Sequence, residues 1–379
     1  MSLIVGVAKE TAEGERRVAV TPKAVELLTR LGAEVWIEKG AGYESGFPDP
    51  EYDAKGVHWA SSAAEIREKA RVLLCVRAPE PQGLDERHAV IGFCDPLSEP
   101  HRAAAFADTG ATLFSVELIP RITRAQSMDA LSSMASIAGY KAVILAAGAL
   151  PRMFPLMMTA AGTIAAARAL ILGAGVAGLQ AIATARRLGA VVMGYDVRPA
   201  VKEQIESLGA KFLQITIEGS GEGEGGYARQ LTEAQIRSQR EQMATALREM
   251  DVVITTAAVP GKKAPILLTK EMVRGMAPGS VVVDIAAERG GNCELTKPGE
   301  TVVDSGVTIL GPVNIPSSVP YHASQMYARN LVAFLKNMVK DQQLHIDTND
   351  EIVRDTLVTQ GGRVVHPKVQ ALLGSVVNA

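Results

Sequence analysis

The sequence has few cysteines, few aromatic residues and almost no net charge, and each shortage excludes a class of protein. The three cysteines, Cys75, Cys94 and Cys293, stand far apart and form neither a Cys-x-x-Cys pair nor a metal-ligand spacing. This excludes a disulfide framework and a zinc site, and fits a reducing compartment. Aromatic residues make up 4% of the chain and the formal net charge is −2. Since nucleic-acid-binding surfaces are basic and often stack bases on aromatic rings, no nucleic-acid partner is expected.

Long uncharged runs are missing as well. Residues 142–185 are very apolar, but Arg152 and Arg168 interrupt them, and the uncharged pieces are shorter than the roughly 18 residues that a membrane span requires. We expect this region to form a buried helix and strand. The first ten residues lack the basic segment that precedes the apolar run of a signal peptide. These features predict a soluble, cytoplasmic chain.

The stretch from Ala169 to Asp196 carries the strongest motif. Its apolar start, residues 169–172, suits a buried parallel strand. Three glycines with the spacing G-x-G-x-x-G follow: Gly173, Gly175 and Gly178. The first permits a tight turn, the second lets a pyrophosphate approach the backbone, and the third lets helix and strand pack closely. The N-terminus of the next helix offers free N–H groups to the phosphates.

An acidic residue at the end of the second strand predicts the cofactor. Asp196 follows the apolar run 191–195 and lies 18 residues after Gly178, where a carboxylate can accept hydrogen bonds from the adenosine ribose. It would repel a 2′-phosphate, so we favour NAD(H) over NADP(H). Arg198 weakens this preference, because an arginine can accommodate the 2′-phosphate.

Strands and helices alternate through most of the chain, which predicts an α/β protein with parallel sheets. We expect two Rossmann-like domains, the second a doubly wound NAD-binding domain inserted in the first. The predicted boundaries are 1–136 for the N-terminal domain, 137–310 for the Rossmann domain and 311–379 for a returning segment. This last segment begins with a long helix over residues 318–340. Residues 212–217 are predicted as a strand, and 307–310 as the last strand.

Two polar segments have both a structural and a functional interpretation. In residues 121–132, Ser127 or Asp129 is suited to cap the helix that continues to about Ala149, and Arg121 is suited to a solvated surface. Residues 218–226 contain five glycines and three glutamates and are predicted to be mobile. On the residues alone, the first segment is equally well a capped helix start or a functional site. The second is better interpreted as an idle flexible linker.

Several motifs together resemble the alanine dehydrogenase and transhydrogenase superfamily. They are the glycine motif and the segments Arg16–Pro22, Gly261–Pro265 and Gly290–Cys293. The segment from Arg121 to Ser132 is similar to the Arg-Gln-Asp loop of the NAD(H)-binding component of proton-translocating transhydrogenases. The resemblance covers nearly the whole chain. It implies an oxidoreductase and translocase in which hydride passes from NADH to NADP⁺ held on a partner.

The resemblance also implies site residues and partners. Arg121, Gln126, Asp129 and Ser132 fall at the nicotinamide end, with Asp129 and Ser132 holding the carboxamide and ribose and Gln126 bridging to the partner's nucleotide. Val176, Asp196, Val197 and Arg198 fall at the family's adenosine-side positions. Gly226 and Tyr227 fall in its mobile loop. The implied partners are an NADP-binding beta subunit, a membrane-spanning alpha-2 subunit and a second copy of the chain in a homodimer. The chain would then lie in the cytoplasm, peripheral to the inner membrane through its partner subunits.

Two other functions remain as alternatives. Alanine dehydrogenases need a cation for the 2-oxo acid carboxylate, which Arg16 or Arg17 supplies, and a general acid–base histidine. The segment where that family carries its histidine reads Val90-Ile-Gly-Phe-Cys-Asp95 here, and His88 and His101 are predicted to be solvated surface residues. The other alternative is a non-enzymatic NAD(H)-sensing module, which would keep the glycine motif without the Arg-Gln-Asp loop.

Overall fold

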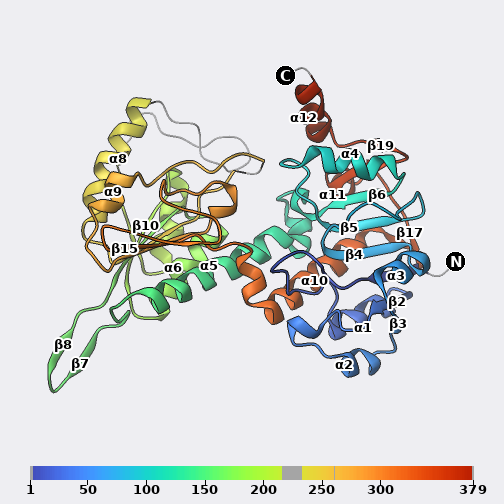
Figure 1. The fold of residues 1–379 in the computed structure, drawn as a ribbon, viewed down its shortest axis with the longest axis horizontal. Helices are drawn as coiled ribbons and strands as arrows, with labels where there is room; N and C mark the ends of the chain where they lie inside the picture. Colours follow the sequence, from blue (N-terminus) through green and yellow to red (C-terminus); the bar gives the residue numbers. More distant parts are fainter. Residues whose placement is uncertain (1–2, 216–232, 260, 378–379) are drawn as a thin grey trace. The chain divides into compact units, whose positions relative to one another are not determined.

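The computed structural model describes residues 3–215, 233–259 and 261–377. These residues form two compact units (Figure 1). Unit 1 comprises residues 1–134 and 317–379, and unit 2 comprises residues 135–316. Unit 1 is therefore discontinuous in sequence, and unit 2 is inserted in it.

An eight-stranded sheet forms the centre of unit 1, in the order β19-β18-β6-β5-β4-β1-β2-β3. Strands β1 to β6 pair in parallel, while β18 joins β6 and β19 in antiparallel orientation. The strands are β1 Leu3–Val7, β2 Ala33–Glu38, β3 His58–Ala60, β4 Val72–Arg77, β5 Ala89–Phe93, β6 Thr112–Ser115, β18 Leu357–Gln360 and β19 Arg363–Val364. A small hairpin, β16 Val339–Lys340 and β17 Gln343–Leu344, forms a separate two-stranded sheet.

Helices cover both faces of this sheet. They are α1 Pro22–Arg30, α2 Asp49–Asp53, α3 Ala63–Lys69, α4 Pro100–Asp108, α10 Pro320–Met338, α11 Glu351–Thr356 and α12 Pro367–Val377. One face packs Ile66 of α3, Phe106 of α4 and Val369 of α12 into a single apolar cluster. On the other face α10 places Phe334 against Phe114 of β6, with ring centroids 5.8 Å apart. The predicted long helix over 318–340 thus corresponds to α10.

A seven-stranded sheet forms the centre of unit 2, in the order β11-β10-β9-β12-β13-β15-β14. All neighbours are parallel except β14 and β15. The strands are β9 Arg168–Leu172, β10 Val191–Tyr195, β11 Lys211–Phe212, β12 Val252–Thr255, β13 Val281–Asp284, β14 Thr301–Asp304 and β15 Val307–Leu310. The helices are α6 Val176–Arg187, α7 Lys202–Ser207, α8 Glu233–Leu247 and α9 Lys270–Arg274, with α5 Ala130–Ala149 crossing from unit 1.

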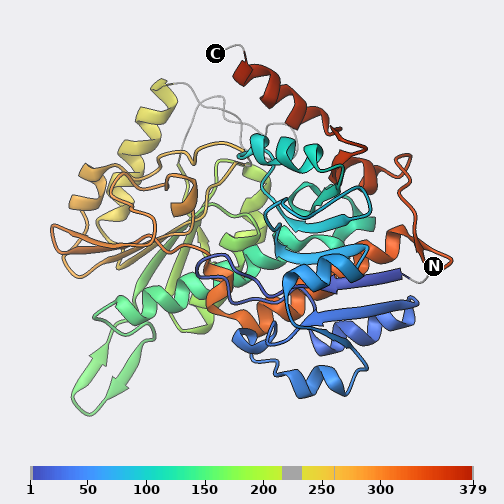
Figure 2. The same cartoon turned by 45° about the vertical axis from the view of Figure 1, so that its right-hand side comes forward.

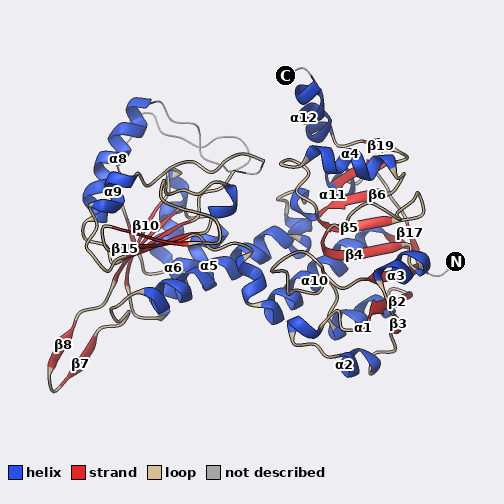
Figure 3. Ribbon diagram, in the orientation of Figure 1, coloured by secondary structure: helices blue, strands red, loops and turns tan. Residues whose placement is uncertain are grey.

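Alternate residues of each buried strand serve two separate cores. Ala169 and Ile171 of β9 pack with α5 and α6, whereas Leu170 and Leu172 pack with α8 and α9. Because side chains alternate between the faces of a strand, a strand covered on both sides is apolar throughout. Unit 2 is accordingly a doubly wound, Rossmann-like domain with helices on both faces of its sheet, as predicted (Figure 3).

Helix α5 is long and apolar enough to cross a membrane by length and composition alone. The core helix of a soluble protein passes the same test, and α5 buries Ala142, Val143 and Ala146 against the sheet of unit 2. It approaches α6 so closely that a Cβ on Gly139 would lie 2.1 Å from the Ala177 carbonyl oxygen. These contacts agree with the predicted buried helix.

The structure corrects two predicted strands. Val307–Leu310 is not the last strand, because β18 and β19 follow it and complete the sheet of unit 1. The strand predicted over 212–217 is only the pair Lys211–Phe212, and residues 213–215 continue without strand pairing. Residues 216 and 217 lie outside the described residues.

A hairpin of β7 Met157–Thr159 and β8 Gly162–Ile164 has no counterpart in the sequence prediction. It extends from unit 2 beyond the seven-stranded sheet, as both ribbon views show (Figures 1 and 2). The sequence places it in an apolar region that is predicted to be buried, yet Leu156 is 59% and Met158 74% exposed.

Candidate functional site

The turn between β9 and α6 leaves no room for side chains at two of its three glycines. Gly173 has a φ of +96°, and a Cβ there would lie 2.5 Å from Thr256 Oγ1. A Cβ on Gly178 would lie 1.8 Å from the carbonyl oxygen of Gly173. Gly173 therefore serves the left-handed turn, and Gly178 serves the contact between helix and turn.

Gly175 differs, because a Cβ there would meet no atom within 4 Å. It is the N-cap of α6, and the Val176 side chain beside it is 43% exposed. The first N–H groups of a helix have no partner within the helix, and the helix dipole places partial positive charge at this end. An exposed helix N-terminus that begins with glycine is suited to bind a phosphate.

Asp196 lies beside this turn. Its carboxylate accepts hydrogen bonds from Ala174 N at 2.8 Å and from Arg198 N at 2.9 Å. The Arg198 guanidinium adds two more contacts, each at 2.9 Å. Burial opposes ionisation, but the hydrogen bonds from Arg198 and Ala174 outweigh it and hold the pKa of Asp196 below its usual value. The structure thus brings Asp196, Val197 and Arg198 to the glycine turn as one charged, preorganised edge.

A second group of hydrogen bonds organises the loops after β12 and β13. The buried carboxylate of Asp284 accepts from Thr255 Oγ1, Ala286 N, Asn292 N, Cys293 N and Thr296 Oγ1. The Asn292 side chain in turn donates to Ala257 O and Pro265 O, both at 2.8 Å, and accepts from Ala257 N. Asp284 and Asn292 therefore hold the two loops together at the carboxyl edge of the sheet.

The sequence prediction assigned no role to Asp284 or Asn292. Two features of the sequence could have indicated a role for them: the Asn lies within the Gly290–Cys293 motif, and the Asp lies at the end of a strand. Cys293 is 1% exposed and is a small buried residue of this region. Among the residues that the structure describes, no three His, Cys, Asp or Glu side chains are arranged to hold a metal ion.

The segment from Arg121 to Ser132 lies in unit 1, apart in the chain from the glycine turn of unit 2. Residues Thr123–Met128 form a 3-10 turn, and Asp129 caps α5, its carboxylate accepting from Ser132 N at 2.8 Å and Ser132 Oγ at 2.6 Å. The predicted helix cap at Asp129 is therefore present. Arg121 and Gln126 are exposed.

Contacts within unit 1 fix this segment to the rest of the unit. Arg124 forms two hydrogen bonds with Asp350, at 2.7 and 2.9 Å, and Asn330 of α10 donates to Ser127 O at 2.9 Å. The exposed side chains are thus carried on an anchored backbone. The resemblance also assigns Gly226 and Tyr227 to the nucleotide site. Both residues, and the rest of the glycine-rich segment 218–226, lie outside the described residues.

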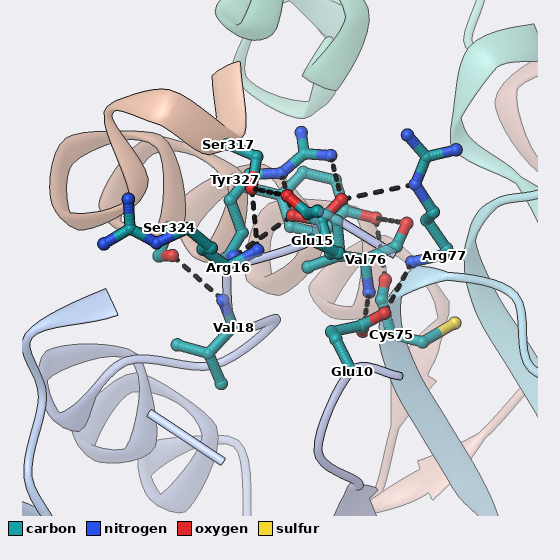
Figure 4. Close-up of polar contacts among 12 residues, drawn as sticks. Glu10, Glu15, Arg16, Val18, Cys75, Val76, Arg77, Ser317, Ser324 and Tyr327 are labelled. Carbon is teal, nitrogen blue, oxygen red and sulfur yellow. Dashed lines mark hydrogen bonds and ion pairs between the residues drawn. The ribbon is translucent and has the colours of Figure 1, made fainter. Parts of the chain in front are cut away.

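The alanine dehydrogenase alternative assigns Arg16 or Arg17 to the carboxylate of an oxo acid. In unit 1 these two residues lie at a buried ionic cluster around Glu15 (Figure 4). Arg17 is 5% exposed, and Glu15 binds it with two hydrogen bonds of 2.7 and 2.6 Å. The same carboxylate accepts from Arg77 Nε at 3.3 Å. Arg16 instead points to solvent, with its side chain 52% exposed and 3.6 Å from Glu44. Glu15 binds Arg17 in a buried pair, so Arg17 is not a free cation for a substrate carboxylate. One carboxylate cannot neutralise two guanidinium groups, and Arg77, with its side chain 42% exposed and a single 3.3 Å contact to Glu15, keeps most of its charge.

The prediction for His88 is wrong. It is 2% exposed, and its two ring nitrogens lie 3.0 Å from Asp85 N and 2.7 Å from Arg67 O. This histidine is a satisfied structural residue. His101 is exposed, as predicted.

Comparison with known proteins decides the family. "Alanine dehydrogenase/PNT, N-terminal domain" matches residues 6–138, and "Alanine dehydrogenase/PNT, C-terminal domain" matches residues 142–367. The chain belongs to the alanine dehydrogenase/PNT family. These two matches together span nearly all of both structural units.

Within the alanine dehydrogenase/PNT family, the transhydrogenases are the more similar branch. The chain is 46% identical to the first part of the NAD(P) transhydrogenase alpha subunit of Rhodospirillum rubrum, over 96% of this chain and 98% of that protein. The crystal structure of transhydrogenase from Sinorhizobium meliloti superposes with a TM-score of 0.86 at 47% identity, covering 96% of this chain and 100% of that one. Alanine dehydrogenase of Bacillus subtilis is 26% identical over 98% of this chain and 95% of that protein.

The glycine turn of this family member yields a paired prediction. Gly178→Ala should destabilise the protein by about 3 kcal/mol or more, because its Cβ would overlap the Gly173 carbonyl. Gly175→Ala should cost about 1 kcal/mol or less, the loss of a favourable cap, yet weaken NADH binding about tenfold or more. Thermal unfolding and fluorescence titration with NADH measure the two effects. Unchanged NADH affinity in Gly175→Ala would show that the turn does not receive the pyrophosphate.

Glu10 gives a prediction on pH. Its carboxyl accepts from Val76 N at 2.6 Å and Arg77 N at 3.2 Å, but burial raises its pKa from 4.5 to about 7. A carboxyl whose pKa is raised on folding stabilises the folded state fully below pH 4.5, and loses that contribution as pH rises through about 7. The free energy of unfolding of the wild type should therefore fall over this range relative to Glu10→Gln. Denaturant unfolding of both proteins at several pH values tests this, and parallel profiles would contradict it.

Proposed function

We propose that this chain is the NAD(H)-binding subunit of a proton-translocating NAD(P) transhydrogenase. Two features of one chain carry the proposal: a complete dinucleotide-binding turn, and a buried arginine, Arg17, that Glu15 already binds with two hydrogen bonds. The first supports binding of a nicotinamide dinucleotide. The second argues against a 2-oxo acid as its reaction partner.

The cofactor preference follows from Asp196. An ionised carboxylate at the end of β10 can accept hydrogen bonds from the adenosine ribose and repels a 2′-phosphate. Arg198 is directed at Asp196, and its two side-chain hydrogen bonds to that carboxylate favour NAD(H). Gly175 and Val176, at the exposed N-terminus of α6, would receive the pyrophosphate.

Hydride transfer between two nicotinamides needs neither an acid nor a base, only close alignment and exclusion of water. The bound NADH supplies the hydride. Asp129 and Ser132, fixed to each other by two hydrogen bonds, would position the carboxamide and ribose. Arg121 would hold the amide or a phosphate, and the exposed Gln126 would bridge to the NADP(H) of the partner.

The partners follow from the names of the relatives, which are alpha subunits and portions of alpha subunits. An NADP-binding beta subunit would hold the hydride acceptor, and a membrane-spanning alpha-2 subunit would couple the redox state to proton movement. The chain would then be peripheral to the inner membrane on its cytoplasmic side. Alanine dehydrogenase is the alternative function. The identity to the alanine dehydrogenase of Bacillus subtilis is lower, at 26%, and residues 90–95 of this chain contain no histidine.

The main test is NADH oxidation by the purified chain. We expect turnover with an NADP-binding transhydrogenase subunit and NADP⁺, and none with pyruvate and ammonia. Turnover with pyruvate and ammonia would instead identify an alanine dehydrogenase.

In the same assay Gln126→Asn should slow single-turnover hydride transfer about tenfold or more, with NADH affinity within about twofold of wild type. The shortened side chain would lose the contact that aligns the two nucleotides. Gln82→Asn, at an exposed position elsewhere in unit 1, is the matched control. Equal transfer rates in both variants would remove Gln126 from the site.

The β7–β8 hairpin supports a homodimer. A two-stranded hairpin is marginally stable by itself. This one carries four large apolar side chains that are 36% to 74% exposed: Leu156, Met157, Met158 and Ile164. An apolar projection of this kind on a soluble protein indicates a contact with another chain, and a second copy is the partner that is always present.

Sedimentation analysis tests the dimer. The wild type should sediment as a dimer, and the double variant Leu156→Asp, Met158→Asp as a monomer, because two buried charges would oppose association. Val303→Asp is the matched control, since Val303 is 66% exposed on β14 of the same unit. A double variant that stays dimeric would place the interface elsewhere.

A further inference from the structure

Unit 1 contains a cavity of about 410 Å³ at the carboxyl ends of β1 and β4. Its wall comprises residues 8–12 after β1, Arg77 at the end of β4 with residues 78–80 after it, and side chains of α3 and α4. Its volume lies within the roughly 300–1,000 Å³ of small-molecule pockets. The glycine turn, in unit 2, contributes nothing to it.

The sheet topology makes this position notable. Strand β1 pairs with β2 on one side and with β4 on the other. The chain passes from β1 to β2 and β3, then returns across β1 to build β4, β5 and β6. In parallel α/β sheets, ligands bind outside the carboxyl ends of the strands where the strand order reverses in this way. The cavity occupies that crevice of unit 1.

The charged side chains around the cavity are mainly cationic: Lys9, Arg67, Arg77 and Arg102, against Glu10 and Glu80. Arg77 contacts Glu15, and Arg102 contacts Glu80 at 3.4 Å. Lys9 and Arg67 form no ion pair with any residue in the described part of the chain. Lys9 and Arg67 are therefore two cations at the cavity whose charge is not balanced by an ion pair with a residue that the structure describes.

Glu10 and Arg102 also affect the charge at the cavity. Glu10 is held by Val76 N and Arg77 N at the end of β4 (Figure 4), and burial raises its pKa to about 7, which reduces its negative charge near neutrality. The Nε of Arg102 is a buried donor without an acceptor among the described residues. Both features lower the electrostatic cost of admitting an anion.

The rest of the wall is apolar and small. Ala63 and Ile66 of α3 and Leu73 and Leu74 of β4 contribute to it. None of the described residues around the cavity has an aromatic ring, so nothing there is suited to stack a purine base. The cavity therefore combines a cationic region with space for a compact apolar group.

We propose that this cavity binds a small phosphate monoester with an apolar body, at a site separate from the glycine turn. The phosphate would lie among Lys9, Arg67 and Arg77, because arginines bind phosphate in bidentate geometry and a dianion matches two uncompensated cations. The apolar body would lie against α3 and β4. The proposal stands whether or not the chain is a transhydrogenase subunit.

Phenyl phosphate is the probe, because it contains no nucleotide that would bind at the glycine turn. Calorimetry on the full chain should give a dissociation constant of about 1 mM or lower, unchanged by saturating NADH. Benzyl alcohol, which has no charge, should not bind measurably, and benzoate should bind about tenfold more weakly.

Variants locate the site. Arg67→Gln should weaken phenyl phosphate binding about tenfold through the loss of charge-assisted hydrogen bonds. Ala63→Leu should abolish binding by filling the cavity while leaving every charge in place. Arg71→Gln is the matched control, since this exposed arginine precedes β4 at the opposite end of the strand, and it should bind within about twofold of wild type.

Four results would overturn the proposal: no binding of phenyl phosphate to the wild type, displacement of the probe by NADH, equal affinity for benzoate, or equal weakening in Arg67→Gln and Arg71→Gln. Normal binding in a folded Ala63→Leu variant would also reject the cavity as the site.

Discussion

The close contact between Gly178 and the carbonyl of Gly173 is the constraint on which unit 2 depends. With no side chain at position 178, α6 starts directly against the end of β9, and its first N–H groups open at the sheet edge. Asp196 then reaches Ala174 N, so the turn and the end of β10 become one rigid surface. Asp284 and Asn292 secure the neighbouring loops by the same means: the Asp284 carboxylate accepts from the backbone N–H of Asn292, and the Asn292 amide donates to the carbonyl of Ala257. The site is thus held in place by hydrogen bonds within the protein.

In unit 1 the buried charges of Glu15 and Arg17 are paired with one another. Glu15 lies between Arg17 and Arg77 and contacts both, so these three side chains form an internal ion cluster. Because breaking a buried ion pair is costly, Glu15 keeps Arg17 from binding a substrate anion.

Local patterns predicted the parts of the fold that depend on local chemistry. The glycine spacing and the apolar runs around it predicted β9, α6 and β10, and a polar residue before an apolar helix predicted the cap at Asp129. The missed elements depend on contacts distant in sequence. Strand β18 forms because Leu357 pairs with β6, more than 200 residues earlier in the chain. His88 is buried because Arg67 O lies beside it in space, and no periodicity reveals such a partner. The β7–β8 hairpin lies in an apolar region whose composition alone cannot distinguish a core from a projecting surface.

The discontinuity of unit 1 has a consequence for synthesis. Its sheet has β1 near the centre and β18 and β19, from the last portion of the chain, at one edge, and α10 covers one face. As the chain leaves the ribosome, the first 134 residues must therefore wait for the whole of unit 2 before they can complete their core. Unit 2 is continuous and can fold while the C-terminal segment is still being made. The nucleotide-binding unit would then form first, and the N-terminal segment would be the portion of the nascent protein most in need of a chaperone.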